Sequence, residues 1–171
     1  MSFSMIADNL KKVKSRIDSV EHNQQVHLIA VSKARSINEI QQAVDAGQMQ
    51  FGENHLQESL HKIDSLEGKN LIWHFIGPIQ SNKTASIAEK FDWVHSIGRY
   101  KIAKRLSDQR PPKLSQLNVL LQLNIDREKT KSGFFLEEIE EIIPEIKKLP
   151  NISLRGFMCI PNPDNSAESF T

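Results

Sequence analysis

Only one cysteine, Cys159, occurs among the 171 residues of this chain. A single cysteine excludes an internal disulfide and makes no metal site without several partners. Its neighbours Phe157, Met158 and Ile160 are apolar, which indicates a thiol packed at the end of a strand rather than a nucleophile. The six histidines include no pair at the His-Glu-x-x-His spacing of zinc enzymes. We therefore predict no metal site.

The chain also lacks a large excess of charge and any long apolar run. Its 22 basic and 21 acidic side chains leave a net charge of +1, without a basic stripe, so nucleic acid is not an expected partner. No apolar run approaches the roughly 20 residues of a membrane span, and the first residues do not resemble a signal peptide. We expect a cytoplasmic protein with no membrane partner. Hydrophobic residues make up 39% of the chain, which favours one core and a single domain over residues 1–171.

The most informative feature present is an apolar run that ends in a lysine. Residues 26–33 read Val-His-Leu-Ile-Ala-Val-Ser-Lys, which predicts a strand covered on both faces, as in parallel sheets. Lys33 then lies at the carboxyl end of a strand, where such sheets bind ligands. Burial there lowers the pKa of an amine, and a neutral amine can form a Schiff base with an aldehyde. The alternative is that Lys33 ends the strand and points into water.

Helical patterns occur before and between the predicted strands. An amphipathic N-terminal helix is predicted from apolar residues that recur every three or four positions, namely Ile6, Leu10, Val13, Ile17 and Val20. A second helix begins after Ser36 as its cap and ends at Gly47, and a third ends near Gly68. Pro144 interrupts the helical pattern before the last strand, which predicts a kink or a restart there.

Further strands are predicted at residues 49–51, 71–76, 93–97, 117–125 and 152–158. Their spacing of roughly 20 to 35 residues is typical of repeated strand–helix units in a parallel sheet. An open doubly wound sheet and a closed barrel both fit this pattern.

Polar residues gather where these strands end. They include Asn54, Ser81, His95, Ser96, Asn124 and Asp126. In a closed barrel they would surround one mouth together with Lys33. His74 differs because it lies within a strand, between Trp73 and Phe75, and two interpretations stay open for it: a hydrogen-bonded core histidine or a ligand-binding one.

Residues 77–84, Gly-Pro-Ile-Gln-Ser-Asn-Lys-Thr, match a nucleotide-binding P-loop except that Asn82 replaces the last glycine. Asparagine tolerates left-handed backbone but adds bulk, and Pro78 removes a backbone donor. We therefore favour a helix start at which Ser81 or Asn82 satisfies free amides, with a nucleotide-binding protein as a remote alternative.

Five blocks of the chain together resemble a known family, the pyridoxal phosphate homeostasis proteins, which are relatives of the N-terminal barrel of alanine racemase. The blocks are residues 28–33, 50–54 (Gln-Phe-Gly-Glu-Asn), 73–83 (Trp-His-Phe-Ile-Gly-Pro-Ile-Gln-Ser-Asn-Lys), 131–133 (Lys-Ser-Gly) and 154–158 (Leu-Arg-Gly-Phe-Met). The resemblance implies an α/β fold, a TIM-type (β/α) barrel of the alanine racemase N-terminal domain type with about six of eight βα units and a preceding helix. It also implies pyridoxal 5'-phosphate bound as a Schiff base to Lys33. By position, Asn54 and His74 are expected to line the cofactor ring.

The family is regarded as cofactor-carrying and regulatory. The resemblance therefore implies intracellular pyridoxal phosphate homeostasis, with the cofactor as ligand and pyridoxal-phosphate-dependent enzymes that receive it as partners. The alternative is an amino-acid racemase. A racemase needs a second acid–base residue on the opposite face of the substrate, which alanine racemase takes from another domain and subunit. We see no such domain in this sequence and expect no catalytic residue.

The resemblance also implies that the chain is C-terminally truncated, because it stops where the family's sixth barrel helix would start. Strands seven and eight, and the phosphate-binding loop after strand seven, would then be missing, so the incomplete barrel would bind cofactor weakly and expose two strand edges prone to association. Lys131 offers a second amine near the same mouth, with a solvated loop lysine as the alternative.

Overall fold

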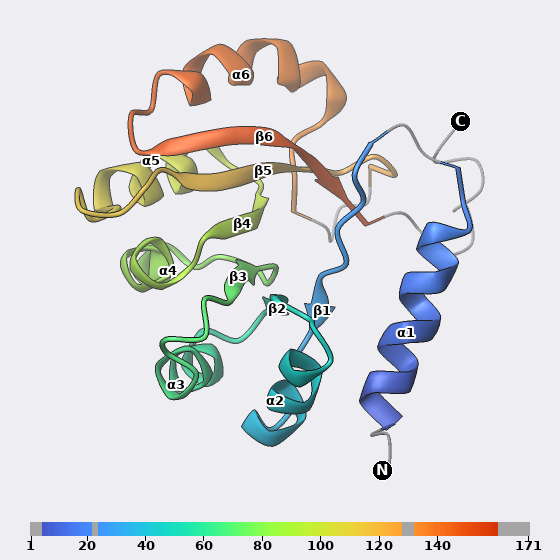
Figure 1. Ribbon diagram of the computed structural model, residues 1–171. Helices are drawn as coiled ribbons and strands as arrows, with labels where there is room; N and C mark the ends of the chain where they lie inside the picture. The colour runs from blue at the N-terminus through green and yellow to red at the C-terminus, as the bar shows by residue number, and fades with distance from the viewer. Residues whose placement is uncertain (1–4, 22–23, 128–131, 161–171) are drawn as a thin grey trace. The chain divides into compact units, whose positions relative to one another are not determined.

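A computed structural model describes residues 5–21, 24–127 and 132–160 (Figure 1). Its elements are α1 (Met5–Asp18), β1 (Ala30–Val31), α2 (Ile37–Asp45), β2 (Gln50–Glu53), α3 (Leu56–Ser65), β3 (Ile72–Phe75), η1 (Ser81–Lys83), α4 (Thr84–Lys90), β4 (Trp93–Ile97), α5 (Tyr100–Gln109), β5 (Leu117–Leu123), η2 (Leu136–Glu138), α6 (Ile139–Lys147) and β6 (Ile152–Cys159). The chain divides into two compact units, residues 1–74 and 75–171, and we describe each by itself. A single domain over the whole chain stays a prediction.

The strands follow one another in a single sheet in chain order, from β1 to β6. The pairs β1–β2, β4–β5 and β5–β6 are parallel. A doubly wound sheet reverses its strand order at a switch point, whereas a barrel keeps the order of the chain. The observed order therefore favours the barrel over the open sheet.

In the first unit, the predicted N-terminal helix forms as α1 and packs beside α2, where Lys14 Nζ donates to the Gly47 carbonyl at 3.4 Å. The predicted strand at residues 26–33 is much shorter, because only Ala30 and Val31 pair with β2. The side-chain amide of Gln48 donates to the carbonyl of Leu28 at 2.7 Å and takes the place of a backbone ladder there. Val31 is 51% exposed, so the prediction that both faces of this strand are covered is wrong.

The start and the end of α2 are as predicted. Ser36 and Glu39 form a capping box in which each side chain accepts from the other residue's backbone amide. At the other end Gly47 has φ of 83°, its amide donates to Val44 O at 2.8 Å, and the Gln48 amide donates to Ala43 O at 2.9 Å. This is a Schellman motif, whose left-handed residue is most easily a glycine.

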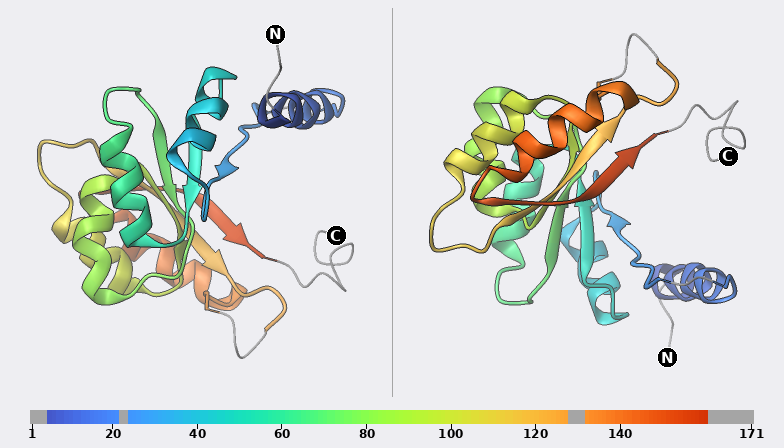
Figure 2. Two further views of the ribbon diagram at one scale, coloured as in Figure 1. Left: turned by 90° about the horizontal axis from the view of Figure 1, so that it is seen from below. Right: turned by 90° about the horizontal axis from the view of Figure 1, so that it is seen from above.

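In the second unit, β4 has the bounds predicted from the sequence, and β5 and β6 lie side by side with α6 against β6 (Figures 1 and 2). The core of this unit includes apolar side chains that are at most 1% exposed, among them Ile87, Phe91, Val94, Ile97, Leu106, Leu117, Val119 and Leu121. The helix α6 continues through Pro144, so the predicted restart is wrong, whereas a kink at Pro144, the other predicted outcome, stays a prediction. The short helix η2 directly precedes α6.

Arg110 is a buried side chain that binds the C-terminal end of α4. It is 5% exposed, and its Nη1 donates to the carbonyls of Ala88 at 2.6 Å and Phe91 at 2.8 Å. Burial lowers the pKa of its guanidinium, and Asp92 raises it again. The C-terminal carbonyls of α4 are thereby satisfied by a buried charge.

Over the described residues, none of the helices combines the length and the apolar character needed to span a membrane. Phe157 on β6 is 47% exposed. Association through strand edges stays a prediction.

Candidate functional site

Lys33 lies in a tight turn directly after β1. The Ser32 amide donates to Gly52 O at 2.9 Å, which extends the parallel ladder one residue past β1, and the Arg35 amide donates back to Ser32 O at 3.0 Å. Ala34, the next residue after Lys33, has φ of 57°, in the left-handed region that non-glycine residues rarely adopt. The Lys33 side chain is exposed in this structure, so the burial that the sequence suggested for its amine is absent from the described residues.

A buried ion cluster lies directly beneath this turn. Lys62 on α3 is 3% exposed, and its Nζ donates to Ser32 O at 2.7 Å and to Glu53 Oε1 at 2.8 Å. Ser32 Oγ also donates to Glu53 Oε1, at 2.7 Å. Glu53 is 0% exposed, and a carboxylate so deep in a protein is tolerated only when paired. We call Lys62, Glu53 and Glu58 the Lys62 cluster.

Glu58 joins the cluster from one turn earlier in α3. Its Oε1 lies 2.5 Å from Lys62 Nζ and accepts from the Ala34 amide at 2.8 Å. The hydrogen bond from Lys62 lowers the pKa of this carboxyl, the Ala34 amide lowers it further, and partial burial opposes both. The cluster thus holds the backbone on both sides of Lys33, at Ser32 and at Ala34.

Asn54 follows β2 as Lys33 follows β1. Since β1 and β2 are parallel neighbours, with Val31 opposite Gly52, both residues lie at the carboxyl edge of this pair. The Asn54 Oδ1 atom is buried and has no hydrogen-bond partner within the described part of the chain. A buried acceptor of this kind can receive a hydrogen bond from a ligand.

His74 is placed differently. It lies inside β3 and is 2% exposed, between Trp73 at 5% and Phe75 at 2%. The Ile72 amide donates to Met49 O at 2.9 Å, so β3 starts beside the residue before β2, and His74 lies within the strand layer rather than past its end. Its environment is that of a core histidine, and a contact with the cofactor ring stays a prediction.

In the second unit, the carboxyl ends of β4, β5 and β6 line a cavity of about 450 Å³ with Ser96, Gln122 and Met158. Ser96 Oγ donates to Gly77 O at 2.5 Å, which ties the end of β4 to the loop after β3. His95, also on β4, is partly buried, and this burial lowers the pKa of its imidazole.

The P-loop-like segment is not a nucleotide site. Thr84, the residue that would bind Mg²⁺ in a P-loop, is 0% exposed, its Oγ1 lies 2.6 Å from Gln109 Oε1, and it accepts from Arg105 Nε at 3.2 Å. The expected cap is also wrong, since Gln80 and Lys83 occupy the cap positions of η1 and α4. Ser81 takes part through its backbone carbonyl, which accepts a hydrogen bond from Arg105 Nε at 3.0 Å.

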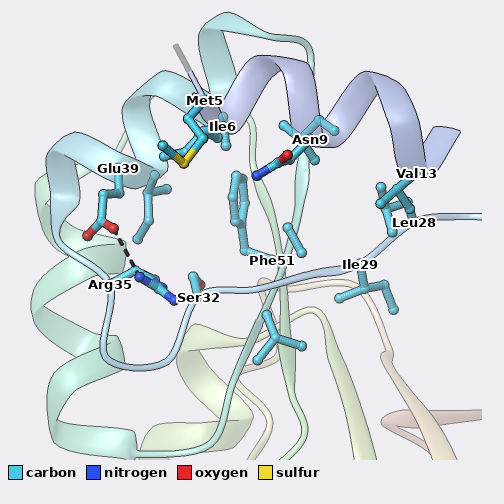
Figure 3. A pocket seen from close by; sticks show the side chains of 15 residues that line it. Met5, Ile6, Asn9, Val13, Leu28, Ile29, Ser32, Arg35, Glu39 and Phe51 are labelled. Atoms are coloured by element: carbon cyan, nitrogen blue, oxygen red, sulfur yellow. Dashed lines mark hydrogen bonds and ion pairs between the residues drawn. The ribbon is translucent and has the colours of Figure 1, made fainter.

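A larger cavity of about 570 Å³ lies in the first unit, between α1, α2 and β1. Met5 and Ile6 from α1 and Phe51 from β2 lie around it (Figure 3). Its lining is mainly apolar and does not include Lys33. Ser32 and Arg35, on either side of Lys33, also line it, so this cavity adjoins the turn that carries Lys33.

Sequence reasoning proposed Lys33 as the cofactor-binding residue, which stays a prediction, and did not anticipate the Lys62 cluster. Glu58 and Lys62 are four residues apart, a spacing usually found in solvated pairs on helix surfaces. One signal was available, since Lys62 falls on the same face of α3 as the buried Ser59 and Leu66. A lysine on the apolar face of a helix needs a buried counter-charge.

Two further sequence predictions, a second amine at Lys131 and the absence of a metal site, stay predictions. Lys131 lies outside the described residues. Within the described ranges, no group of three His, Cys, Asp or Glu side chains is arranged to hold a metal ion.

Comparison with known proteins places this arrangement in a family. The family model of the alanine racemase N-terminal domain matches residues 2–170. The pyridoxal phosphate homeostasis protein of Escherichia coli (strain K12) is 46% identical over 94% of this chain and 72% of its own length. The protein of the same name from Pseudomonas aeruginosa is 49% identical, with the same coverage.

Solved structures agree with the fold. PipY of Synechococcus elongatus PCC7942, determined with PLP bound, has a TM-score of 0.82 at 29% identity and covers 97% of this chain and 76% of its own. Alanine racemase from Corynebacterium glutamicum has a TM-score of 0.71 at 18% identity, covering 98% of this chain and 47% of its own. The predicted TIM-type α/β barrel fold is thereby confirmed.

Proposed function

We propose a cofactor-binding function for this chain, which belongs to the pyridoxal phosphate homeostasis proteins and carries the alanine racemase N-terminal domain. The proposed ligand is pyridoxal 5'-phosphate, held as a Schiff base on Lys33. Support comes from PipY, a structural neighbour determined with PLP bound, and from the name shared by relatives at 46% and 49% identity. The single observation that carries the proposal is the place of Lys33, an exposed amine in a turn at the carboxyl end of a parallel strand.

The residues of the first unit fit such a ligand. The cofactor supplies an aldehyde that reacts with amines, and Lys33 presents an accessible amine. Asn54 offers a buried acceptor without a partner among the described residues, suited to a hydroxyl or protonated ring nitrogen. The exposed position of Lys33 leaves room for a ligand to cover it, and a bound ring would supply the apolar cover that the chain alone lacks.

We further propose that the chain holds and delivers cofactor rather than turning over an amino acid, in the cytoplasm, with pyridoxal-phosphate-dependent enzymes as recipients. The relatives at 46% and 49% identity are named homeostasis proteins, whereas the alanine racemase neighbour at 18% identity shares the fold alone. An amino-acid racemase is the second candidate, because that neighbour is an enzyme built on the same barrel.

The test is to add pyridoxal 5'-phosphate, reduce with borohydride, digest, and locate the label by mass spectrometry. The label is expected on the peptide containing Lys33, and Lys33→Ala should abolish it. Lys69→Ala, which removes another exposed lysine of the same unit, is the matched control and should leave the label unchanged. A label found mainly on other lysines would refute the assignment.

The racemase alternative is decided separately. The protein loaded with cofactor is incubated with L-alanine and other L-amino acids, and the products are separated on a chiral column. We expect no D-isomer above the level produced by free cofactor. Turnover that Lys33→Ala abolishes would favour the racemase.

A further inference from the structure

We propose that Lys62 is a positioning residue for Lys33: through its ion cluster it fixes the turn that presents the Lys33 amine to an aldehyde ligand. This inference rests on the proposed function, because the reactivity it concerns is that of Lys33. Lys62 itself does not touch the ligand in this proposal. It acts through the backbone of residues 32–34.

The first observation is that Lys62 donates to the carbonyl next to Lys33 and to the two carboxylates that accept hydrogen bonds from Ser32 and Ala34. Its Nζ has three acceptors within 2.8 Å: the Ser32 carbonyl, Glu53 Oε1 and Glu58 Oε1. The side chain is 4% exposed, so water competes little for these bonds. An ammonium with three donors is fully used by three acceptors, which leaves it one stable orientation.

The second observation is that the cluster reaches both peptide groups next to Lys33. On one side Lys62 donates to Ser32 O, and Ser32 Oγ donates to Glu53. On the other side Glu58 accepts from the Ala34 amide at 2.8 Å. The position of the Lys33 Cα, between these two anchors, therefore depends on α3.

The third observation is the backbone conformation that these anchors hold. Ala34 has φ of 57°, which an alanine adopts only where its surroundings impose it. The Glu58–Ala34 hydrogen bond acts on that residue directly. Without the cluster, the turn would relax to ordinary backbone angles and the Lys33 side chain would point in other directions.

The charges of the cluster decide which variants to make. Two carboxylates share one ammonium, and Glu53 Oε2 is buried without a hydrogen-bond partner among the described residues. Removing Lys62 alone would leave the Glu53 charge buried and uncompensated, which threatens folding itself. Lys62→Met combined with Glu53→Gln removes the buried charge pair while keeping the volume. Glu58→Gln, at a side chain 35% exposed, weakens the bonds of residue 58 to Lys62 and to the Ala34 amide and leaves the buried Glu53–Lys62 pair in place.

Two measurements are made on the 171-residue chain and these variants. The first is titration with pyridoxal 5'-phosphate, followed by imine absorbance and by borohydride labelling at Lys33. The second is amide hydrogen exchange of the peptide that contains residues 32–35. Lys104→Met with Asp108→Asn, which removes an exposed ion pair on α5, is the matched control.

For Lys62→Met/Glu53→Gln we expect at least tenfold weaker imine formation, and for Glu58→Gln at least threefold. Exchange in residues 32–35 should be faster in both variants, with the melting temperature within a few degrees of the parent chain. The control should change neither measurement. Unchanged affinity in a folded variant, or unchanged exchange, overturns the proposal; if the double variant does not fold, Glu58→Gln decides by the same criteria.

Failure of the proposed function gives a different result. If the parent chain takes no label at Lys33, the cofactor assignment is wrong, and so is a role for Lys62 in cofactor reactivity. The exchange measurement then still reports whether Lys62 holds the turn, because it needs no ligand.

Discussion

Gly98 and Gly133 approach each other backbone to backbone in the second unit. A Cβ atom added to Gly98 would lie 2.9 Å from the Gly133 nitrogen and 3.2 Å from its Cα. The first distance is shorter than Cβ contacts in proteins, the second is tighter than most of them, and both neighbouring atoms belong to the backbone. The end of β4 and the segment after β5 therefore need a glycine at position 98 to lie this close.

Gly98→Ala should destabilise the chain by about 1–3 kcal/mol, the usual cost of overpacking a site that cannot relax. Thermal melting followed by circular dichroism measures this. Gly68→Asn is the comparison: nothing lies within 4 Å of its added Cβ, so only the φ of 83° opposes the change, and the loss should be smaller than for Gly98→Ala because asparagine accepts left-handed backbone better than most residues. Equal melting temperatures for Gly98→Ala and the parent would contradict the close contact.

Ser36→Ala should lower the free energy of unfolding by about 1 kcal/mol, because the α2 amide of Glu39 loses its cap. Urea titration at neutral pH measures the change. Ser36→Asp keeps a capping oxygen and should recover most of the loss. If alanine and aspartate behave alike, the capping box contributes nothing to stability.

Glu58 predicts a pH dependence of stability. Its folded pKa lies below the ordinary value of 4.5, chiefly because of the hydrogen bond from Lys62, so its ionised form is favoured by folding. That stabilisation is complete above pH 4.5 and disappears as the pH falls through the lower folded value. The stability difference between the parent and Glu58→Gln should therefore be constant from pH 5 to 7 and shrink in more acid solution, as chemical unfolding at each pH would show. A difference that grows on acidification would mean that the carboxyl is protonated in the fold.

His95 predicts a dependence at higher pH. Burial lowers its folded pKa below 6.5, so the unfolded chain takes up a proton first. Stability should therefore fall as the pH drops through 6.5 toward the folded value, and His95→Gln should flatten the profile in that window. An NMR titration should place the imidazole midpoint below 6.5. A midpoint at or above this value would contradict burial as the dominant influence on the ring.

Much of the fold could be predicted from the sequence, because most of the helices and strands have a signal in their own local residue pattern. The strand Trp93–Ile97 was predicted with its observed bounds, and the cap at Ser36 was predicted from local chemistry alone. The helix α5 was missed, since its buried positions include the small residues Ala103 and Ser107 among many charged ones.

What could not be predicted depends on contacts between distant residues. The sequence of residues 26–29 resembles a strand. In the structure, the side-chain amide of Gln48, twenty positions after Leu28, donates to the Leu28 carbonyl, which therefore has this partner instead of a backbone amide of a neighbouring strand. From the sequence, Lys62 resembles one partner of a solvent-exposed ion pair with Glu58. Its burial depends on the contact with Glu53, which the sequence pattern does not indicate. Lys33 was proposed as a site residue from its predicted position at a strand end, whereas the exposure of its side chain depends on which parts of the chain cover the turn.

The hydrogen bonds of the Gln48 side chain also affect how the first unit unfolds locally. Its amide bridges the carbonyls of Leu28 and Gln50, each at 2.7 Å, in place of a run of backbone bonds. The preceding helix α1 has no buried residue. A segment with so little burial and such sparse backbone pairing unfolds locally at a small fraction of the global free energy. Amides of α1 should therefore exchange with solvent long before those of β2, so the N-terminal arm would behave as a separate cooperative unit that can detach while the sheet stays folded.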